Sequence, residues 1–208
     1  MQKICLAGYS GHAFVVAEIV SLLNYTLIGY LDIEEKTNNP FGLKYLGNEI
    51  EVDLSQFVDQ NIHIALGTGD NKMRKRLGEI FEKNKIPVKP LKHPAASVSS
   101  LSSLGEGVIV MSSAIINPFV KIGKGVICNS GCIIEHECVV GDYAHIAPGA
   151  ILAGNVLVGE NSFIGSNSVI KQGTKIGENV IIGAGSVVLN DVPDNAIAYG
   201  NPARIKNQ

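Results

Sequence analysis

The sequence contains no tryptophan, and aromatic residues make up 6% of its 208 positions. It has no basic excess, because 17 Lys and Arg residues face 19 Asp and Glu residues. A chain without a cationic stripe offers no electrostatic footprint for a nucleic-acid backbone. No run approaches the roughly 18 uninterrupted apolar residues that a membrane helix needs. We therefore expect neither nucleic-acid binding nor a membrane span.

Signals for export and for a cysteine-based metal or redox site are also lacking. The first 20 residues have no basic region followed by a small-residue cleavage site, so we expect a cytoplasmic protein. None of the four cysteines forms a C-x2-C pair, which argues against zinc knuckles and redox motifs. We expect reduced thiols that serve as small core residues. The cysteines are Cys5, Cys128, Cys132 and Cys138.

The first half of the chain alternates strand-like and helix-like patterns. Helical periodicity covers 11–23 and 70–85, and Asp70 is placed to cap the second helix. Alternation of this kind predicts a parallel sheet, here of about four strands, packed against helices. The strand candidates are 3–9, 26–32, 61–67 and, as a short edge strand interrupted by proline, 88–94.

Beyond Ala95 a six-residue period replaces the helical one. The first position of each hexad is apolar from Leu104 to Val188, and the fifth is small or β-branched from Val108 to Val192. We read no insertion in this register between Leu104 and Val192. Such a period fits a parallel β-helix, in which each hexad is one short strand plus a corner and three hexads make a coil.

Two domains follow from this change of rhythm. Residues 1–95 form a Rossmann-like half domain and residues 96–208 a β-helix, with the tail from Ala196 as its cap. Cys128, Cys132 and Cys138 occupy inward positions of the hexads, so we expect them to be core residues. Flat-sided prisms associate side by side, so a homotrimer is the expected oligomer.

The stretch CIIEHECVVGDYAHIAPGA places two histidines, His136 and His145, on outward positions of the β-helix. An imidazole there can serve as a general base, and a solvated surface histidine is the alternative interpretation. A metal site would need His136, His145 and a carboxylate, but the spacing matches no known zinc site. We therefore expect no metal.

The stretch GYSGHA, residues 8–13, carries a second signal. A strand, a glycine turn and a helix place backbone N–H groups where they suit a diphosphate. The full dinucleotide fingerprint is absent, since Ser10 and Gly11 do not complete G-x-G-x-x-G. A dehydrogenase is therefore not expected, while a phosphate-bearing ligand is.

These motifs together resemble a known family. The motifs are GYSGH (8–12), YLD (30–32), ALGTGDN (65–71), IEHECVVGDYAHIAPGA (134–150) and GNPAR (200–204). They are similar to the left-handed β-helix acyltransferases, and more narrowly to the trimeric sugar acyltransferases with an N-terminal nucleotide-sugar-binding domain. That branch includes N-acetyltransferases of UDP- or dTDP-linked 4-amino-4,6-dideoxy sugars, and relatives that act as sialic acid O-acetyltransferases.

The resemblance implies roles for residues of the β-helix. His136 would be the general base, with Glu137 raising its basicity, and His145 would contact acetyl-CoA. Asn129 would orient the amine or the carbonyl, although an asparagine at a bend is often structural. The arm of acetyl-CoA would run between neighbouring β-helices along Ser166, Gly183 and Ala184.

For the first domain the resemblance implies nucleotide-sugar binding by Ser10, Gly11, His12, Asp32 and Gly67. These positions follow the carboxyl ends of parallel strands, where open α/β sheets bind ligands. Some relatives carry two acids after the second strand. This sequence has Asp32 followed by Ile33, which leaves base and ribose selectivity open.

The leading expectation is an acetyl-CoA-dependent N-acetyltransferase acting on the 4-amino group of a UDP- or dTDP-linked sugar by direct transfer. An O-acetyltransferase of sialic acid or another sugar hydroxyl, using the same base, is the first alternative. A non-catalytic β-helix scaffold is the alternative of another class.

Overall fold

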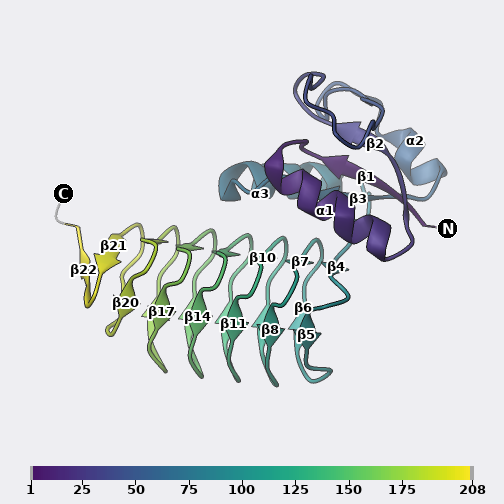
Figure 1. Cartoon of the computed structure of the whole chain (residues 1–208). Helices are drawn as coiled ribbons and strands as arrows, with labels where there is room; N and C mark the ends of the chain where they lie inside the picture. The colour runs from purple at the N-terminus through teal and green to yellow at the C-terminus, as the bar shows by residue number, and fades with distance from the viewer. Residues whose placement is uncertain (1, 207–208) are drawn as a thin grey trace.

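The computed structural model describes residues 2–206, which form an α/β half and a β-helix (Figure 1). The α/β half contains a three-stranded parallel sheet in the order β2-β1-β3. Its elements are β1 (Lys3–Ala7), α1 (Gly11–Leu22), β2 (Thr26–Leu31), α2 (Ser55–Asp59), β3 (Ile62–Leu66) and α3 (Asn71–Lys83). The two long helices start where the sequence predicted, and Asp70 caps α3 by accepting the amide of Met73 at 2.8 Å.

The expected fourth strand of this sheet does not form. Val88 makes a single bridge to Ile64, and the next strand, β4 (Leu91–Lys92), pairs with the β-helix instead. Pro87 and Pro90 flank Val88, and neither has an N–H to extend a ladder. The segment therefore ends the sheet and begins the first coil of the β-helix.

From Leu91 to Val188 the β-helix is a stack of two-residue parallel strands on three faces, and partners lie eighteen residues apart (Figure 1). The first face contains β4, β7 (Ile109–Val110), β10 (Ile127–Cys128), β13 (His145–Ile146), β16 (Phe163–Ile164), β19 (Ile181–Ile182), β21 (Ile197–Gly200) and β22 (Ala203–Ile205). The second face contains β5 (Ser97–Val98), β8 (Ile115–Ile116), β11 (Ile133–Ile134), β14 (Ile151–Leu152), β17 (Val169–Ile170) and β20 (Val187–Val188). The third face contains β6 (Ser103–Leu104), β9 (Lys121–Ile122), β12 (Val139–Val140), β15 (Leu157–Val158) and β18 (Lys175–Ile176).

The interior of the β-helix follows the hexads. The apolar first positions and the small fifth positions form one buried cluster, which includes Cys128, Cys132 and Cys138 as predicted. Buried serines at fifth positions satisfy their hydroxyls on corner carbonyls, as Ser162 Oγ does on Gly177 O at 2.7 Å.

The hexad register changes in the last coil. Val192 pairs with Ile176, sixteen rather than eighteen residues earlier. The prediction of an unbroken register to Val192 is therefore wrong for this final step. The shortened coil is followed by the β21–β22 hairpin, which packs Ala198 and Ala203 against the end of the core.

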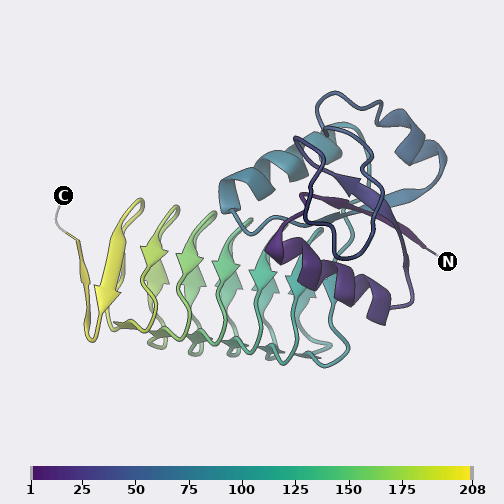
Figure 2. The same cartoon turned by 45° about the horizontal axis from the view of Figure 1, so that its top comes forward.

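The two halves share a core, and Figure 2 shows α1 running alongside the first coils of the β-helix. Helix α1 lies over the first coils of the β-helix, and its apolar side forms one cluster with Ile109, Met111 and Ile127. Outward residues of the first face are therefore buried near the N-terminal end of the stack. Within residues 2–206, none of the helices combines the length and the apolar character needed to cross a bilayer.

A buried arginine of α3 fastens the halves together. Arg74 has no exposed surface, and burial lowers the pKa of its guanidinium to about 10, so it stays charged at neutral pH. It donates to carbonyls of the β-helix at Gly125 (2.7 Å), Tyr143 (2.7 Å) and Ala144 (3.2 Å). It also donates to Gly69 O at 3.0 Å, at the end of the loop that precedes α3. One side chain thus ties that loop to two corners of the β-helix.

Two imidazoles lie beside this guanidinium. Burial first, and then the charge of Arg74, lower the pKa of His145 to about 3 and that of His12 to about 4. Their Nδ1 and Nε2 atoms, respectively, are buried without a hydrogen-bond partner. Both rings are therefore neutral in the folded protein at physiological pH.

These depressed pKa values predict acid sensitivity. Unfolded histidines bind protons near pH 6.5, whereas folded His145 and His12 stay neutral. The free energy of unfolding should therefore fall as pH drops below 6.5, by up to about 1.4 kcal/mol per pH unit for each histidine. Chemical denaturation between pH 6.5 and 5 measures this slope. His145→Gln should make it shallower, and His93→Gln, outside the interface, should not. Parallel slopes for the wild type and His145→Gln would refute the account.

Candidate functional site

A pocket of about 130 Å³ opens at the carboxyl ends of the three strands of the α/β half. Its walls come from the loops after β1, β2 and β3 and from one side of α3. The lining residues are Gly8, Tyr9, Ser10, Asp32, Ile33, Glu49, Thr68, Met73 and Leu77. Two of the predicted ligand-binding residues, Ser10 and Asp32, are among them.

The N-terminus of α1 at this pocket is open to an anion. Ser10 is the N-cap residue, but its side chain makes no capping hydrogen bond, and the first turn contains no acidic residue. Ser10 and Gly11 are both exposed. Unsatisfied N–H groups and the helix dipole together favour a phosphate group at such an end.

Asp32 is held rigidly at the wall of the same pocket. Its Oδ2 accepts the amide of Tyr9 at 2.8 Å and its Oδ1 accepts the amide of Ile33 at 2.8 Å. Lys36 adds an ion pair at 3.0 Å. The carboxylate thus joins the loops that follow β1 and β2 and presents a fixed acceptor to a ligand.

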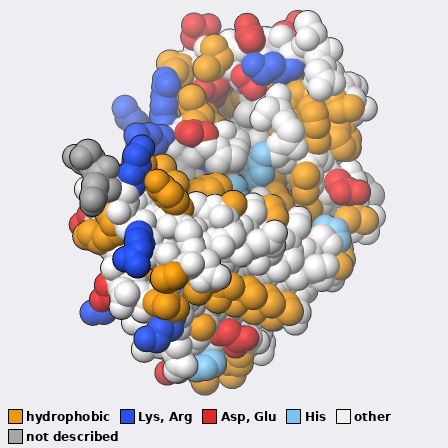
Figure 3. All heavy atoms as spheres, turned by 60° about the vertical axis from the view of Figure 1, so that its left-hand side comes forward, with side chains coloured by type: hydrophobic (Ala, Val, Ile, Leu, Met, Phe, Trp, Pro, Cys, Tyr) orange, Lys and Arg blue, Asp and Glu red, His pale blue; other side chains and the backbone are white. Residues whose placement is uncertain are grey.

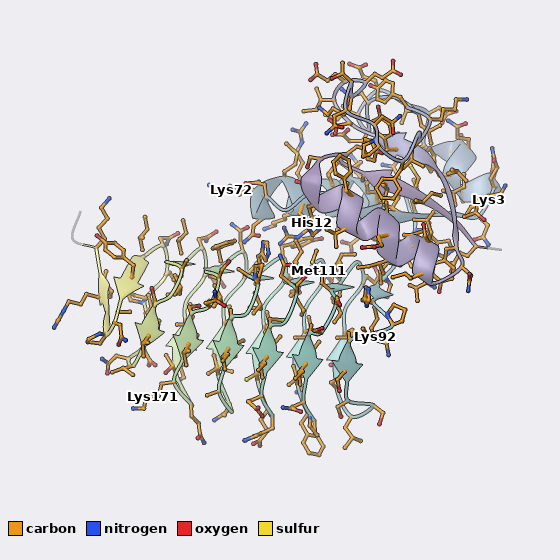
Figure 4. All side chains as sticks on the ribbon, in the orientation of Figure 1. Lys3, His12, Lys72, Lys92, Met111 and Lys171 are labelled. Atoms are coloured by element: carbon orange, nitrogen blue, oxygen red, sulfur yellow. The ribbon has the colours of Figure 1, made fainter. Side chains whose placement is uncertain are left out.

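For two other predicted ligand-binding residues, the contacts in the structure are with other parts of the protein. His12 points from α1 toward the β-helix, where it meets Arg74 and His145 (Figure 4). Gly67 lies so close to the loop after β1 that a Cβ there would collide with Gly8 O and touch Ala13 Cβ at 3.0 Å. A requirement for close packing therefore explains this glycine by itself.

The pair His136–Glu137 stands at the corner between the second and third faces, the second corner. His136 Nδ1 lies 3.1 Å from Glu137 Oε2, and the side chains are 52% and 63% exposed. In the tautomer that donates Nδ1–H to the carboxylate, Nε2 keeps a free lone pair. This arrangement fits a general base oriented by a carboxylate.

The next coil makes room for this imidazole. Gly154 lies eighteen residues after His136, and a Cβ at Gly154 would come within 2.6 Å of His136 Cε1 and 2.7 Å of Nε2. The ring therefore occupies the space that a side chain at position 154 would need. Glu137 has φ of 62°, a conformation unusual for a residue with a Cβ, and the equivalent corner residues Phe119 and Asn155 share it.

Asn129 stands at the corner between the first and second faces, the first corner. Its Nδ2 lies 3.0 Å from His145 Nε2, and its Oδ1 accepts the amide of Ser130. Because His145 is neutral, its Nε2 accepts from the amide of Asn129. Phe163 packs edge-on against the ring, with centroids 5.0 Å apart.

The expectation that His145 lies on an outward position holds for the β-helix, but the side chain is not open to solvent. The residue is outside the packed interior of the β-helix, but it is 8% exposed because the α/β half of the same chain covers it. Figure 3 shows a recess between the halves, with histidine side chains visible in it. A cleft of about 650 Å³ continues from the start of α3 along Phe163 and Ile181.

The residues expected to contact acetyl-CoA continue the first corner toward the C-terminus. Ala147, Gly165 and Gly183 follow Asn129 at intervals of eighteen residues, with Ser166 and Ala184 next to the two glycines. Ser166 and Gly183 are half-buried and Ala184 is exposed. The corner thus offers a shallow, small-residue surface that begins at Asn129.

The base candidate and this surface lie at opposite ends of the strands of the second face. Asn129 precedes β11 and His136 follows it. Figure 4 marks the two corners by Met111 and Lys171: Met111 lies against the α/β half and Lys171 on the far side of the β-helix. A single copy therefore does not bring His136 to Asn129 and His145.

Three contributors to the site had no place in the sequence interpretation: Arg74, Glu49 and Gly154. Gly154 was detectable, since it follows His136 by one full coil. Nothing in the sequence marked Arg74 as buried or Glu49 as part of the pocket. Among the described residues, no group of three His, Cys, Asp or Glu side chains is arranged to hold a metal ion.

Comparisons with known proteins match both halves. Residues 3–81 match the family model of the PglD N-terminal domain, and residues 155–190 match that of the bacterial transferase hexapeptide repeats. A curated relative from Bacillus subtilis, UDP-N-acetylbacillosamine N-acetyltransferase, is 34% identical over 113 residues. The match covers 54% of this chain and 52% of that protein, so the chain spans about half the length of this relative.

Two solved structures match over nearly the whole of both chains. The acetyltransferase domain of PglB from Neisseria gonorrhoeae, in complex with acetyl coenzyme A, is 31% identical with a TM-score of 0.92, and 99% of each chain is covered. PerB from Caulobacter crescentus, in complex with CoA and GDP-perosamine, is 34% identical with a TM-score of 0.92, covering 100% of this chain and 98% of that one. The chain therefore belongs to the hexapeptide-repeat sugar acetyltransferases with a PglD-type N-terminal domain, a family of enzymes that use acetyl-CoA.

Proposed function

We propose that this protein transfers the acetyl group of acetyl-CoA to the 4-amino group of a nucleotide-linked 4-amino-4,6-dideoxy sugar. The observation that carries the proposal is the pair His136–Glu137, in which Nδ1 is engaged by the carboxylate and Nε2 is free. The names of the relatives support an amine acceptor rather than a hydroxyl, since they are N-acetyltransferases of bacillosamine and perosamine. UDP and dTDP remain the expected carriers, and the GDP-linked substrate of PerB adds a third.

Transfer is direct in this account. The amine nitrogen attacks the thioester carbonyl, the C–N bond forms, and the nitrogen gives its proton to His136 Nε2. The tetrahedral intermediate then expels the thiolate of CoA as the C–S bond breaks. A cysteine nucleophile is not involved, because all four cysteines are buried and burial raises the pKa of the Cys138 thiol.

The α/β half would hold the nucleotide. The open N-terminus of α1, with Ser10 and Gly11, suits the diphosphate, and Asp32 suits the ribose or the base. The sugar would then extend into the recess above His145 and Asn129. The neutral imidazole of His145 and the amide of Asn129 would hold the acetyl group or the amine in place.

A homotrimer would complete the site. The second face carries an outward apolar column that the α/β half leaves uncovered, with Ile115 and Val169 the most exposed. The column consists of Ile115, Ile133, Ile151, Val169 and Val187. If three such faces pack around an axis, the first corner of one copy meets the second corner of the next. His136 of one copy would then approach Asn129 and His145 of its neighbour.

The base assignment predicts a large loss of turnover in His136→Ala. General-base catalysis typically contributes 10²- to 10⁴-fold, so kcat should fall by about that factor while CoA binding persists. Free thiol release is followed with acetyl-CoA and a panel of UDP-, dTDP- and GDP-linked 4-amino sugars, with sialic acid as a hydroxyl acceptor. His93→Ala is the matched control, because that ring only accepts the amide of Ala95.

The panel separates the alternatives. Turnover with sialic acid and none with amino sugars would replace the proposed acceptor by a hydroxyl. An absence of thiol release with every acceptor would favour a non-catalytic scaffold. Full kcat in His136→Ala would refute the base assignment whichever acceptor reacts.

If the site is composite, built from residues of two neighbouring copies, we expect that a variant that cannot form the trimer also loses activity. Ile151→Glu puts a charge in the centre of the second face and should convert a trimer to monomers, because three buried carboxylates would meet at the axis. Val139→Glu makes the same kind of change on the third face, where Lys121 is a neighbour, and should leave the trimer intact. Light scattering after gel filtration gives the mass, and thiol release gives the activity. An active Ile151→Glu monomer would contradict the composite site.

A further inference from the structure

Glu49 is a buried acid without an internal partner. The residue is 4% exposed, and its carboxylate makes neither a hydrogen bond nor an ion pair within the described chain. The carboxylate oxygens are not among the fully buried atoms that lack a hydrogen-bond partner, so they keep access to solvent at the wall of the pocket. The Tyr45 hydroxyl lies near Glu49: burial first, and then the charges of neighbouring acids, Glu49 among them, raise the pKa of Tyr45. A negative carboxylate repels the phenolate form of Tyr45. Tyr45 therefore does not account for the position of Glu49.

Glu49 lies where two hollows meet. It lines the strand-end pocket together with Ser10 and Asp32, and it also lines a neighbouring cleft of about 700 Å³. The same side of α3 runs along both, first through Met73 and Leu77, then through Ile80 and Asn84. Spacings of three and four residues keep these side chains on one helix face. The two hollows therefore lie next to each other along α3, with Glu49 in the wall of both.

The second acid of the pocket, Asp32, is satisfied differently. Both of its oxygens already accept backbone amides, and Lys36 neutralises its charge. Glu49 has neither kind of partner. Of the two carboxylates, Glu49 is therefore the one that has no hydrogen-bond or ion-pair partner among residues 2–206.

The order of the two hollows along α3 indicates which part of a ligand reaches Glu49. A diphosphate at the N-terminus of α1 places the ribose near Asp32. The base, on the far side of the ribose, then enters the cleft, whose walls include the apolar side chains of Ile50, Val52 and Ile80. A flat ring with a polar edge suits apolar walls that contain one carboxylate.

We propose that Glu49 is the base-recognising residue of the nucleotide site, accepting a hydrogen bond from a ring N–H of the nucleobase. Guanine, uracil and thymine carry such a donor on the edge that pairs with other bases. Adenine and cytosine carry a ring acceptor there, which a carboxylate repels. The inference rests on the proposed function, and it supplies the second acid that Ile33 does not provide.

The test measures nucleotide affinity, independently of acetyl transfer. Titration calorimetry with the full chain compares GDP, UDP, dTDP, ADP and CDP binding to the wild type, Glu49→Gln and Glu51→Gln. Wild type should bind at least one of GDP, UDP and dTDP more tightly than ADP or CDP. Glu49→Gln should weaken that nucleotide about 10- to 100-fold, the range for a lost charge-assisted hydrogen bond. Glu51→Gln, an exposed acid two residues away, should bind as the wild type does.

Each other result has a definite meaning. Equal binding by the wild type and Glu49→Gln overturns the assignment of Glu49 and leaves the proposed function standing. An equal loss for all five nucleotides overturns base recognition, since it means that Glu49 contacts the ribose they share. Failure of every nucleotide to bind the wild type overturns both this inference and the proposed function.

Discussion

The stacking of coils at intervals of eighteen residues is the constraint on which the rest of the structure depends. Strands of two residues are too short to be stable alone, so each gains its hydrogen bonds from the coils before and after it. Because of this stacking, residues eighteen apart in the sequence lie above one another in a column. The column of His136 continues in Gly154, which leaves space for the imidazole, and the column of Asn129 continues in Gly165 and Gly183.

The site also depends on how the α/β half is attached to the β-helix. Arg74 supplies charged donors to carbonyls from the loop before α3 and from two corners of the β-helix. That contact seals His145 and His12 away from water and, with its charge, keeps them unprotonated. A neutral His145 can accept from Asn129, whereas an imidazolium could not. The contact that joins the two halves therefore also sets the protonation state of His145.

The β-helix was largely predictable from the sequence, because six-residue periodicity allows few other folds. Where the prediction failed, at Val192 and in the strand around Val88, the period shortens or proline removes a hydrogen-bond donor. The exposed pair His136–Glu137 was also predictable, since neighbours in the sequence stay neighbours at a corner.

Contacts between the halves were not predictable in the same way. Arg74 lies 69 residues from Tyr143 and Glu49 belongs to a loop without periodicity, so neither carries a local signal. His145 was placed correctly on the outside of the prism, but it is buried there beside Arg74 and His12 of the α/β half, which are distant in the sequence. Periodicity gives the face on which a side chain lies; it does not give what covers that face.

A structure of the assembled protein with CoA and a nucleotide-linked 4-amino sugar bound would test the central claim most directly. The account predicts a trimer in which the sugar amine lies within about 2.6–3.2 Å of His136 Nε2 from one copy. Asn129 and His145 of the adjacent copy should line the same site. An amine bound within a single copy, out of reach of any His136, would contradict it.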